Sequence, residues 1–399
     1  MERAPMARAS SIRLGILTLA ASFLLLCITP TSRLVGAGIP ARLDDGAFWS
    51  LITEFSEPGG YFRSDNLVSN ETAFQHVIPA LQEQLRPASA YLGVGPDQNF
   101  TYIAAFHPRI AFIVDIRRQN MLLHLMYKAV LEAAPTRADF LSLLFSRARP
   151  ASTTPSDTAD ALFTAFDGST ADPRLFDRNL REVTRRLTKQ HHFSLSTDDL
   201  RSIEYVYRSF FSAGPDLRYS FGRGPGWLAF PSYRDLMLED DGQGARRSYL
   251  ASEANYQALR DLELRNLVVP LVGDFAGPKA LRAVGTYLRQ RGATVSVFYT
   301  SNVEQYLFRG DEWQRFYSNV GALPIDGRST FIRAYFNNAG RPFFYRVPGP
   351  SASGPATSPG VVSLTGPRSE TLLNPISILL AAYAEGHISN YYDVIELSR

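Results

Sequence analysis

Cysteine is almost absent from the sequence. The one cysteine, Cys27, lies in the N-terminal segment, so the chain beyond it has neither a disulfide nor thiolate chemistry. The six histidines show no H-E-x-x-H or other metal-ligand spacing, and we expect no metal site. A G-x-S-x-G turn, which carries the nucleophile of many hydrolases, does not occur either. These absences exclude a disulfide scaffold and argue against a metalloenzyme or a serine hydrolase.

An excess of charge of one sign is also lacking. The 399 residues include 41 basic and 38 acidic ones, and four of the basic and one of the acidic residues lie in residues 1–37. The rest of the chain therefore holds 37 residues of each sign. A neutral body has no electrostatic footprint for nucleic acid. We expect a globular protein that binds a small-molecule ligand and no nucleic acid; the oligomeric state is left open.

The apolar run near the N-terminus is short. Residues 14–28 follow an arginine-bearing lead and number about fifteen, whereas a membrane helix needs roughly 20. This pattern is typical of a signal peptide, with small residues at Val35-Gly36-Ala37 for cleavage. The alternatives are an uncleaved anchor and no export at all. We expect an exported protein, periplasmic or extracellular, or one anchored to the membrane through this segment alone.

Hydrophobic patterning predicts an α/β fold with a doubly wound, mostly parallel sheet and a helical insertion. Strands are expected at residues 88–94, 110–116, 267–272 and 294–299, with helices at 99–106, 119–133 and 278–291. Residues 330–337 and 342–347 alternate like paired strands that close the sheet. The expected segments are a signal or anchor (1–37), an N-terminal helical part (38–87), the α/β domain (88–347) with its insertion (about 136–265), a Pro/Gly/Ser-rich loop (348–367) and a C-terminal helical part (368–399).

A glycine turn suggests a nucleotide site. Gly93-Val94-Gly95 lies between a predicted strand and helix, where backbone N–H groups can receive polar atoms of a ligand. Glycine is also common in turns that bind no ligand, so this motif alone is weak evidence for a nucleotide site. Asp115 strengthens it, because an acid 20 residues after Gly95, at the end of the next strand, can bind both ribose hydroxyls. Alternatively, Asp115 caps the following helix or pairs with Arg117 or Arg118.

Longer strings carry a family resemblance. The segments PGGYF, DNLVSNE, GVGPDQNF, VDIRRQN, VGDFAGPKALR and YTSNVEQYLF resemble an uncharacterised bacterial family whose fold is similar to class I S-adenosylmethionine-dependent methyltransferases. The resemblance covers residues 47–345 and implies a seven-stranded, doubly wound sheet with a helical insertion. The first functional hypothesis, which the glycine turn, Asp115 and the sheet pattern support, is an enzyme that uses S-adenosylmethionine as cofactor for in-line methyl transfer to a small molecule. The opposing hypothesis is an exported, non-catalytic ligand-binding module on the same fold.

The resemblance assigns cofactor-binding residues to the glycine turn. Gly93, Gly95 and Asp97 match the first methyltransferase motif, and Gln98 and Asn99 belong to the same turn. Asp115 matches the ribose-binding carboxylate. The chain departs from the motif, because Tyr91 stands at its acidic position and Asp97 at its third glycine. In the dinucleotide fingerprint, the third glycine would instead fall at Gln98. These departures require altered contacts with any cofactor.

Further candidates follow the later strands. Asp274 is placed to contact the adenine amine or, alternatively, to cap the helix from residue 278. Ser301 and Asn302 lie at the substrate-facing edge and Glu304 could act as a base; the alternative is that Ser301 or Asn302 is the N-cap of helix 303–308. Residues 93–99, Asp115 and Asp274 should surround one pocket. Six polar residues upstream could also line it: Asp65, Asn66, Ser69, Asn70, Glu71 and Thr72.

Overall fold

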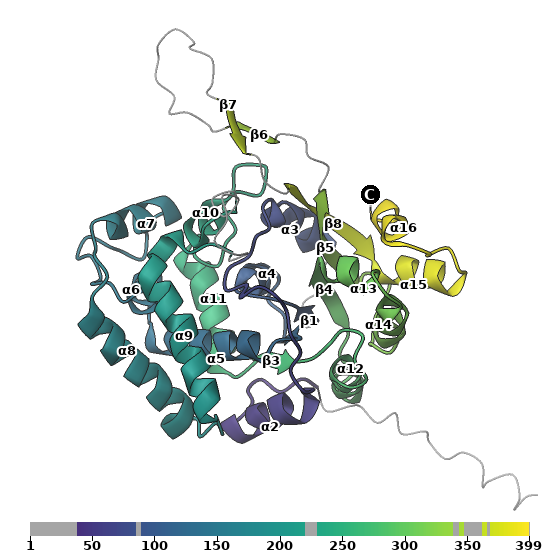
Figure 1. Ribbon diagram of the computed structural model, residues 1–399, viewed down its shortest axis with the longest axis horizontal. Helices are drawn as coiled ribbons and strands as arrows, with labels where there is room; N and C mark the ends of the chain where they lie inside the picture. Colours follow the sequence, from purple (N-terminus) through teal and green to yellow (C-terminus); the bar gives the residue numbers. More distant parts are fainter. Residues whose placement is uncertain are drawn as a thin grey trace, which may run out of the picture. The chain divides into compact units, whose positions relative to one another are not determined.

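The computed structural model describes residues 38–84, 89–219, 230–337, 343–346, 361–364 and 368–398. The expected signal or anchor segment, with Cys27, lies outside these residues. Within them the chain is an α/β protein with a mostly parallel sheet flanked by helices (Figure 1). None of the helices in the described part is long and apolar enough to cross a membrane.

The main sheet has six strands in the order β3-β2-β1-β4-β5-β8. The first five are parallel and β8 runs antiparallel to β5. Every residue of β1, β2 and β3 is buried, as expected for parallel strands covered on both faces. The bounds are β1 Ala90–Gly93, β2 Ile110–Asp115, β3 Val268–Val272, β4 Val295–Ser301, β5 Thr330–Asn337 and β8 Arg368–Pro375.

Helices flank the sheet in two groups. One group, on the left of the sheet in Figure 1, includes α5 and α11, which pack against each other, and α11 also packs against α4. The other group, on the right, includes α12 and α14, which also pack together. The bounds are α4 Gln98–Phe106, α5 Arg118–Ala133, α11 Glu253–Leu264, α12 Ala280–Gln290, α13 Val303–Leu307 and α14 Glu312–Gly321.

The interval between α5 and β3 is helical where the structure describes it, apart from two isolated bridges that join Arg147 to Ala171 and Arg218 to Ser232. Its regular elements before α11 are α6 Arg137–Phe145, α7 Ala159–Asp167, α8 Pro173–Arg185, the π-helical turn Arg186–Gln190, α9 Thr197–Ala213, the 3-10 turn Gly214–Asp216 and α10 Tyr233–Leu238. The described residues of this interval therefore form helices, as the hydrophobic patterning predicts.

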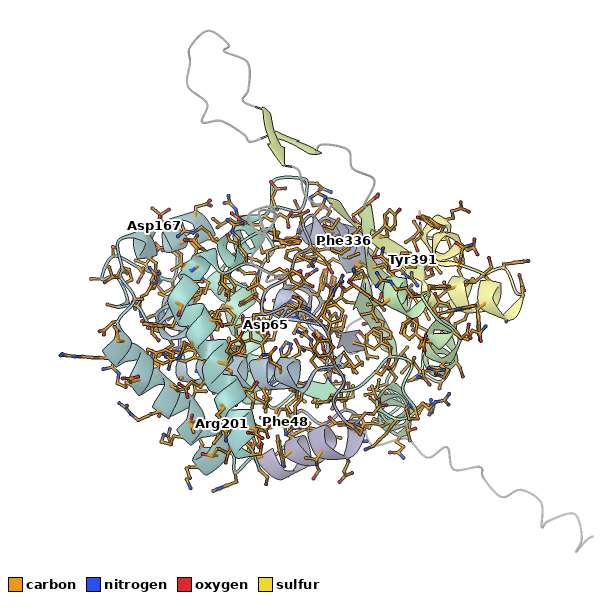
Figure 2. The ribbon with its side chains drawn as sticks, viewed as in Figure 1. Phe48, Asp65, Asp167, Arg201, Phe336 and Tyr391 are labelled. Atoms are coloured by element: carbon orange, nitrogen blue, oxygen red, sulfur yellow. The ribbon has the colours of Figure 1, made fainter. Side chains whose placement is uncertain are left out.

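Helices near both ends of the described chain pack onto the same core. Helix α2 (Asp45–Phe55) contacts β3, and α15 (Ile376–Ala384) contacts β8. Phe48 of α2 and Tyr391 of α16 (Tyr391–Glu396) are both buried (Figure 2). Before β1, a 3-10 turn (Phe74–Val77) and α3 (Ile78–Gln84) follow the long loop that starts after α2.

The strands beyond β5 differ from the prediction. Residues 343–346 form β6, which pairs with β7 (Val361–Leu364) in a separate two-stranded ribbon and not with β5. The stretch 348–367, predicted as loop, thus contains β7; its other residues lie outside the described part. Residues 368–399, predicted as helical, begin with β8. This strand buries the polar Ser369 and Asn374, so apolar alternation does not reveal it.

Candidate functional site

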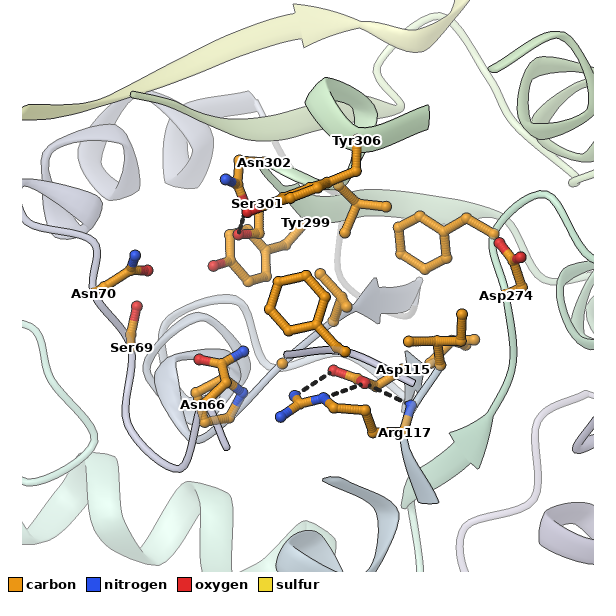
Figure 3. A pocket seen from close by; sticks show the side chains of 18 of the residues that line it. Asn66, Ser69, Asn70, Asp115, Arg117, Asp274, Tyr299, Ser301, Asn302 and Tyr306 are labelled. Carbon is orange, nitrogen blue, oxygen red and sulfur yellow. Dashed lines mark hydrogen bonds and ion pairs between the residues drawn. The ribbon is translucent and has the colours of Figure 1, made fainter. Parts of the chain in front are cut away.

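A pocket opens at the carboxyl ends of the parallel strands, with a cavity volume of about 300 Å³ (Figure 3). Gly95 follows β1, Asp115 ends β2, Asp274 follows β3, and Ser301 and Asn302 lie at the end of β4. The strand order reverses between β1 and β4, which is where open α/β sheets form ligand crevices. The structure therefore brings together five of the candidates that are far apart in the sequence.

The loop before β1 forms another wall of the pocket. Asn66, Ser69, Asn70 and Glu71 line it, as expected for four of the six upstream polar residues. The other two have partners outside the pocket. Asp65 accepts a hydrogen bond from the Tyr205 hydroxyl at 2.8 Å, and the Thr72 backbone N–H donates to Ser369 Oγ at 2.8 Å.

The Asp115 carboxylate is held by Arg117. Arg117 donates from its backbone N–H and from Nε to Oδ1, at 2.9 and 3.0 Å, and from Nη2 to Oδ2 at 2.9 Å. The same guanidinium donates to the carbonyl oxygens of Ser64 and Asp65. The pairing alternative is thus what the structure contains, and it attaches the upstream loop to β2. Oδ2 accepts one hydrogen bond and keeps acceptor capacity, since each carboxylate oxygen has two lone pairs.

The glycine turn is organised by Asn99. Its buried amide donates to the carbonyl oxygens of Val94 and Pro96, at 2.9 and 2.7 Å, and accepts from the Tyr91 hydroxyl at 2.8 Å. A Cβ at Gly93 would collide with this amide, so glycine is required there. Neither Gly93 nor Asn99 is among the pocket-lining residues. Tyr91, at the place of the acidic residue of the methyltransferase motif, therefore supports the turn through Asn99.

The side chains of Asp97 and Gln98 are also hydrogen-bonded to other residues of the protein. Asp97 is 1% exposed and accepts a hydrogen bond from the Tyr249 hydroxyl at 3.0 Å. Burial, only partly offset by this hydrogen bond, raises the pKa of Asp97 to about 7. Gln98 accepts from Ser69 Oγ and donates to Glu71 Oε2 at 2.9 Å. Neither residue lines the pocket, although Gln98 binds two residues that do.

Glu304 does not fit the role of a base in the pocket. Its carboxylate is fully buried, outside the pocket lining, and forms a bidentate ion pair with Arg333. Tyr317 donates a further hydrogen bond to it at 2.9 Å. The sequence around residues 303–308 does not indicate this ion pair, because Arg333 lies on β5. The carboxylate neutralises Arg333 and does not face the pocket, so the predicted role as a base is wrong.

The structure also bears on two capping alternatives. The first backbone N–H groups of α12, at Lys279 and Ala280, donate to Glu57 Oε1 at 2.7 and 2.8 Å, so Glu57 and not Asp274 caps this helix. Asp274 accepts from the Ala276 N–H in the preceding turn. Asn302 stands at the N-cap position of α13 but makes no capping hydrogen bond through its side chain.

Glu71 is the residue that sequence reasoning did not single out. Its carboxylate lines the pocket yet is 1% exposed, and it accepts hydrogen bonds from Gln98, Tyr299 and Ser301. Burial raises the pKa of Glu71, and these donors partly offset the shift. The partners lie 27 to 230 positions away in the chain, so no local motif marks the cluster. The density of polar residues in the loop was the one available signal.

Ser301 is held in an uncommon backbone conformation. Its φ of 53° lies in the left-handed region, next to a register shift between β4 and β5 at Tyr299 and Ser301. This conformation is unfavourable for a residue with a Cβ, and such residues concentrate at functional sites. Here it accompanies the hydrogen bond from the Ser301 hydroxyl to Glu71.

Comparison with known proteins identifies a family. A family model described as a domain of unknown function (DUF7790) matches residues 66–347, which is more than half of the chain. The chain belongs to this family. No curated protein matches the chain. The DUF7790 match includes Glu71, Asp115, Asp274 and Ser301, so the polar part of the pocket lies within the family's domain.

Proposed function

We propose that this DUF7790 protein is methyltransferase-like, binds S-adenosylmethionine in the pocket and transfers its methyl group to a small molecule. The observation that carries the proposal is one pocket, at the point where strand order reverses, lined by Gly95, Asp115 and Asp274 together. The order β3-β2-β1-β4-β5 is that of a doubly wound nucleotide-binding sheet, which supports a Rossmann-like classification.

The pocket's residues fit an adenosine group. Val114, Ile116 and Phe275 offer apolar surface near the two aspartates, which suits a purine ring. Asp115 Oδ2 has acceptor capacity for ribose hydroxyls. Gly95, at φ 80°, has no side chain to fill the space toward Asn66. The volume of about 300 Å³ is at the lower end of the roughly 300–1,000 Å³ typical of small-molecule sites.

Methyl transfer requires few reactive groups from the protein. S-adenosylmethionine supplies an activated methyl group when bound, and the protein must orient the nucleophile and, if it is protonated, accept a proton. Ser301 and Asn302 lie across the pocket from Asp115 and Arg117 (Figure 3). This separation supports a cofactor end near Asp115 and a substrate end near Ser301.

Asp115→Asn should abolish recognition of the ribose hydroxyls. Wild-type protein should bind adenosine more tightly than 2′,3′-dideoxyadenosine, and the variant should lose this preference. Hydrogen bonds to a charged acceptor contribute about 1.5–3 kcal/mol each, against about 1 for neutral ones, so the preference should fall roughly ten- to a hundredfold. Isothermal titration of both nucleosides against both proteins measures it.

Comparing two nucleosides separates ribose binding from the structural role of the Asp115–Arg117 pair. Loss of that pair alone would weaken both nucleosides equally. The matched control is Asp198→Asn on α9, whose carboxylate is exposed and should leave the preference unchanged. A folded Asp115→Asn protein that still prefers adenosine by the wild-type ratio would end the ribose assignment.

The second candidate is an exported, non-catalytic ligand-binding module. It is favoured by the glycine turn, where the side chains of Asp97, Gln98 and Asn99 all have protein partners. The turn is therefore a rigid support for the pocket and contributes few groups to a cofactor. Single-turnover assays with labelled S-adenosylmethionine and a panel of small nucleophiles separate this candidate from a methyltransferase.

Export is tested independently of ligand binding. Residues 1–45, fused to a reporter enzyme that is active only outside the cytoplasm, should give reporter activity, because an arginine-bearing lead and a short apolar core are typical of export signals. The same fusion with two arginines inserted in residues 14–28 is the control and should be inactive. A wild-type fusion that stays inactive in the cytoplasm argues against the export proposal.

A further inference from the structure

The Glu71 carboxylate lies in the pocket wall without a cationic partner among the described residues. None of the ion pairs in the described part of the chain includes it. Its three donors, from Gln98, Tyr299 and Ser301, are all neutral. A buried carboxylate is normally paired with a cation, because hydrogen bonds from neutral groups compensate only part of its lost hydration.

Two other buried carboxylates at this end of the sheet have a cationic partner. Asp115 is paired with Arg117, and Glu304 is paired with Arg333. Glu71 thus contrasts with two acids, on β2 and on α13, whose charge is neutralised within the protein. Burial raises the pKa of Glu71, which is the expected cost of leaving this charge uncompensated.

The geometry of the carboxylate leaves room for one more donor. Oε1 accepts from the hydroxyls of Tyr299, at 2.9 Å, and Ser301, whereas Gln98, at 2.9 Å, is the donor to Oε2 among the residues that the structure describes. A carboxylate oxygen has two acceptor sites, so Oε2 has one to spare. Asn70 and Asn302 also line the pocket.

Aromatic rings accompany the carboxylate. Tyr299 and Tyr306 line the pocket, and Phe62 packs edge-on against Tyr306 with ring centroids 5.4 Å apart. The faces of aromatic rings attract cations, and the Arg309 guanidinium already lies 4.6 Å from the Tyr306 ring centroid in this way. Chloride, phosphate or a carboxylate ligand would be repelled by Glu71 in its charged form.

We propose that the Glu71 end of the pocket is a subsite for a protonated amine, with Glu71 as its counter-ion and Tyr299 beside it. The inference rests on the proposed function for the location of the adenosine end, and it adds the chemical class of the group bound at the other end. The ammonium belongs either to the amino-acid part of the cofactor or to the substrate.

Two matched pairs of probes test the subsite. S-adenosylhomocysteine and its deamino analogue differ only in the amine of the cofactor part, while 2-phenylethylamine and 2-phenylethanol model a substrate with and without the charge. Titrations use wild-type protein, Glu71→Gln and, as a control, Glu204→Gln, whose carboxylate is exposed on α9. Wild-type protein should prefer the amine of at least one pair roughly ten- to a hundredfold, as for a charge-assisted hydrogen bond.

Glu71→Gln should reduce that preference to less than about threefold, and Glu204→Gln should keep it. Loss within the nucleoside pair assigns the subsite to the cofactor, and loss within the phenyl pair assigns it to the substrate. Wild-type protein that prefers the amine in neither pair overturns the inference, even if Glu71→Gln does not fold. A preference within the phenyl pair without any adenosine binding would overturn the proposed cofactor and leave the amine subsite standing.

Discussion

Arg333→Met should lower the free energy of unfolding by about 3–5 kcal/mol. Arg333 is 0% exposed, and its guanidinium is the cationic partner of the buried Glu304 carboxylate. Removing one member of a buried ion pair leaves the other charge without compensation, and losses of this size follow. Urea denaturation followed by circular dichroism measures the change, provided that the transition is two-state.

The double variant Glu304→Met/Arg333→Met is the control for this prediction. Replacing both members of a buried pair with apolar side chains is often close to neutral, so the double variant should be more stable than Arg333→Met alone. Tyr317 then loses its acceptor, so part of the loss should persist. A double variant that is as unstable as the single one would show that volume and not charge dominates at this position.

Asp97→Asn should stabilise the protein at pH 8.5 and only about a third as much at pH 5. Burial raises the pKa of Asp97 from 3.8 to about 7, so between these values the folded protein keeps a proton that the unfolded chain has released. The stability contributed by the neutral acid is fully present below about pH 4 and is lost as the pH rises through 7. One pKa unit corresponds to about 1.4 kcal/mol, so the loss is on the order of 4 kcal/mol.

Asparagine resembles the protonated acid, keeps an acceptor for the Tyr249 hydroxyl and carries no charge at pH 8.5. The measurement is the difference in unfolding free energy between variant and wild type at both pH values. Glu239 and Glu263 also have raised pKa values, of about 8 each, through burial, and their contribution cancels in this difference. The exposed Asp198→Asn variant should show no such change. An equal difference at pH 5 and pH 8.5 would contradict a neutral Asp97.

Strands of the parallel sheet could be predicted from the sequence because the residues of each strand themselves show that it is buried. The predicted strands 110–116, 267–272 and 294–299 correspond to β2, β3 and β4 within two residues at either end. A strand covered on both faces needs a continuous apolar run, and helices between such runs require parallel connections. The edge strand β8 was missed, because it buries Ser369 and Asn374 where a core strand would have apolar side chains.

The site could be predicted only in outline. A glycine turn and an acid at the end of the next strand indicated where a pocket would lie, since the carboxyl ends of parallel strands share one edge. Which polar groups are available to a ligand depends on partners from distant segments. Arg333 for Glu304 and Ser301 for Glu71 come from other strands, 29 and 230 positions away. Pairing at such separations leaves no pattern in a local window.

The antiparallel strand β8 affects how the family's domain can be isolated. The matched region ends at residue 347, whereas β8 starts at Arg368 and pairs with β5 along its whole length. A fragment cut at the family boundary would expose a row of unpaired backbone donors and acceptors on β5, and such an edge recruits strands from other molecules. It would also lose Ser369, to which Thr72 of the pocket loop is hydrogen-bonded. Insolubility of that fragment would therefore report a missing edge strand and not an intrinsically unstable domain.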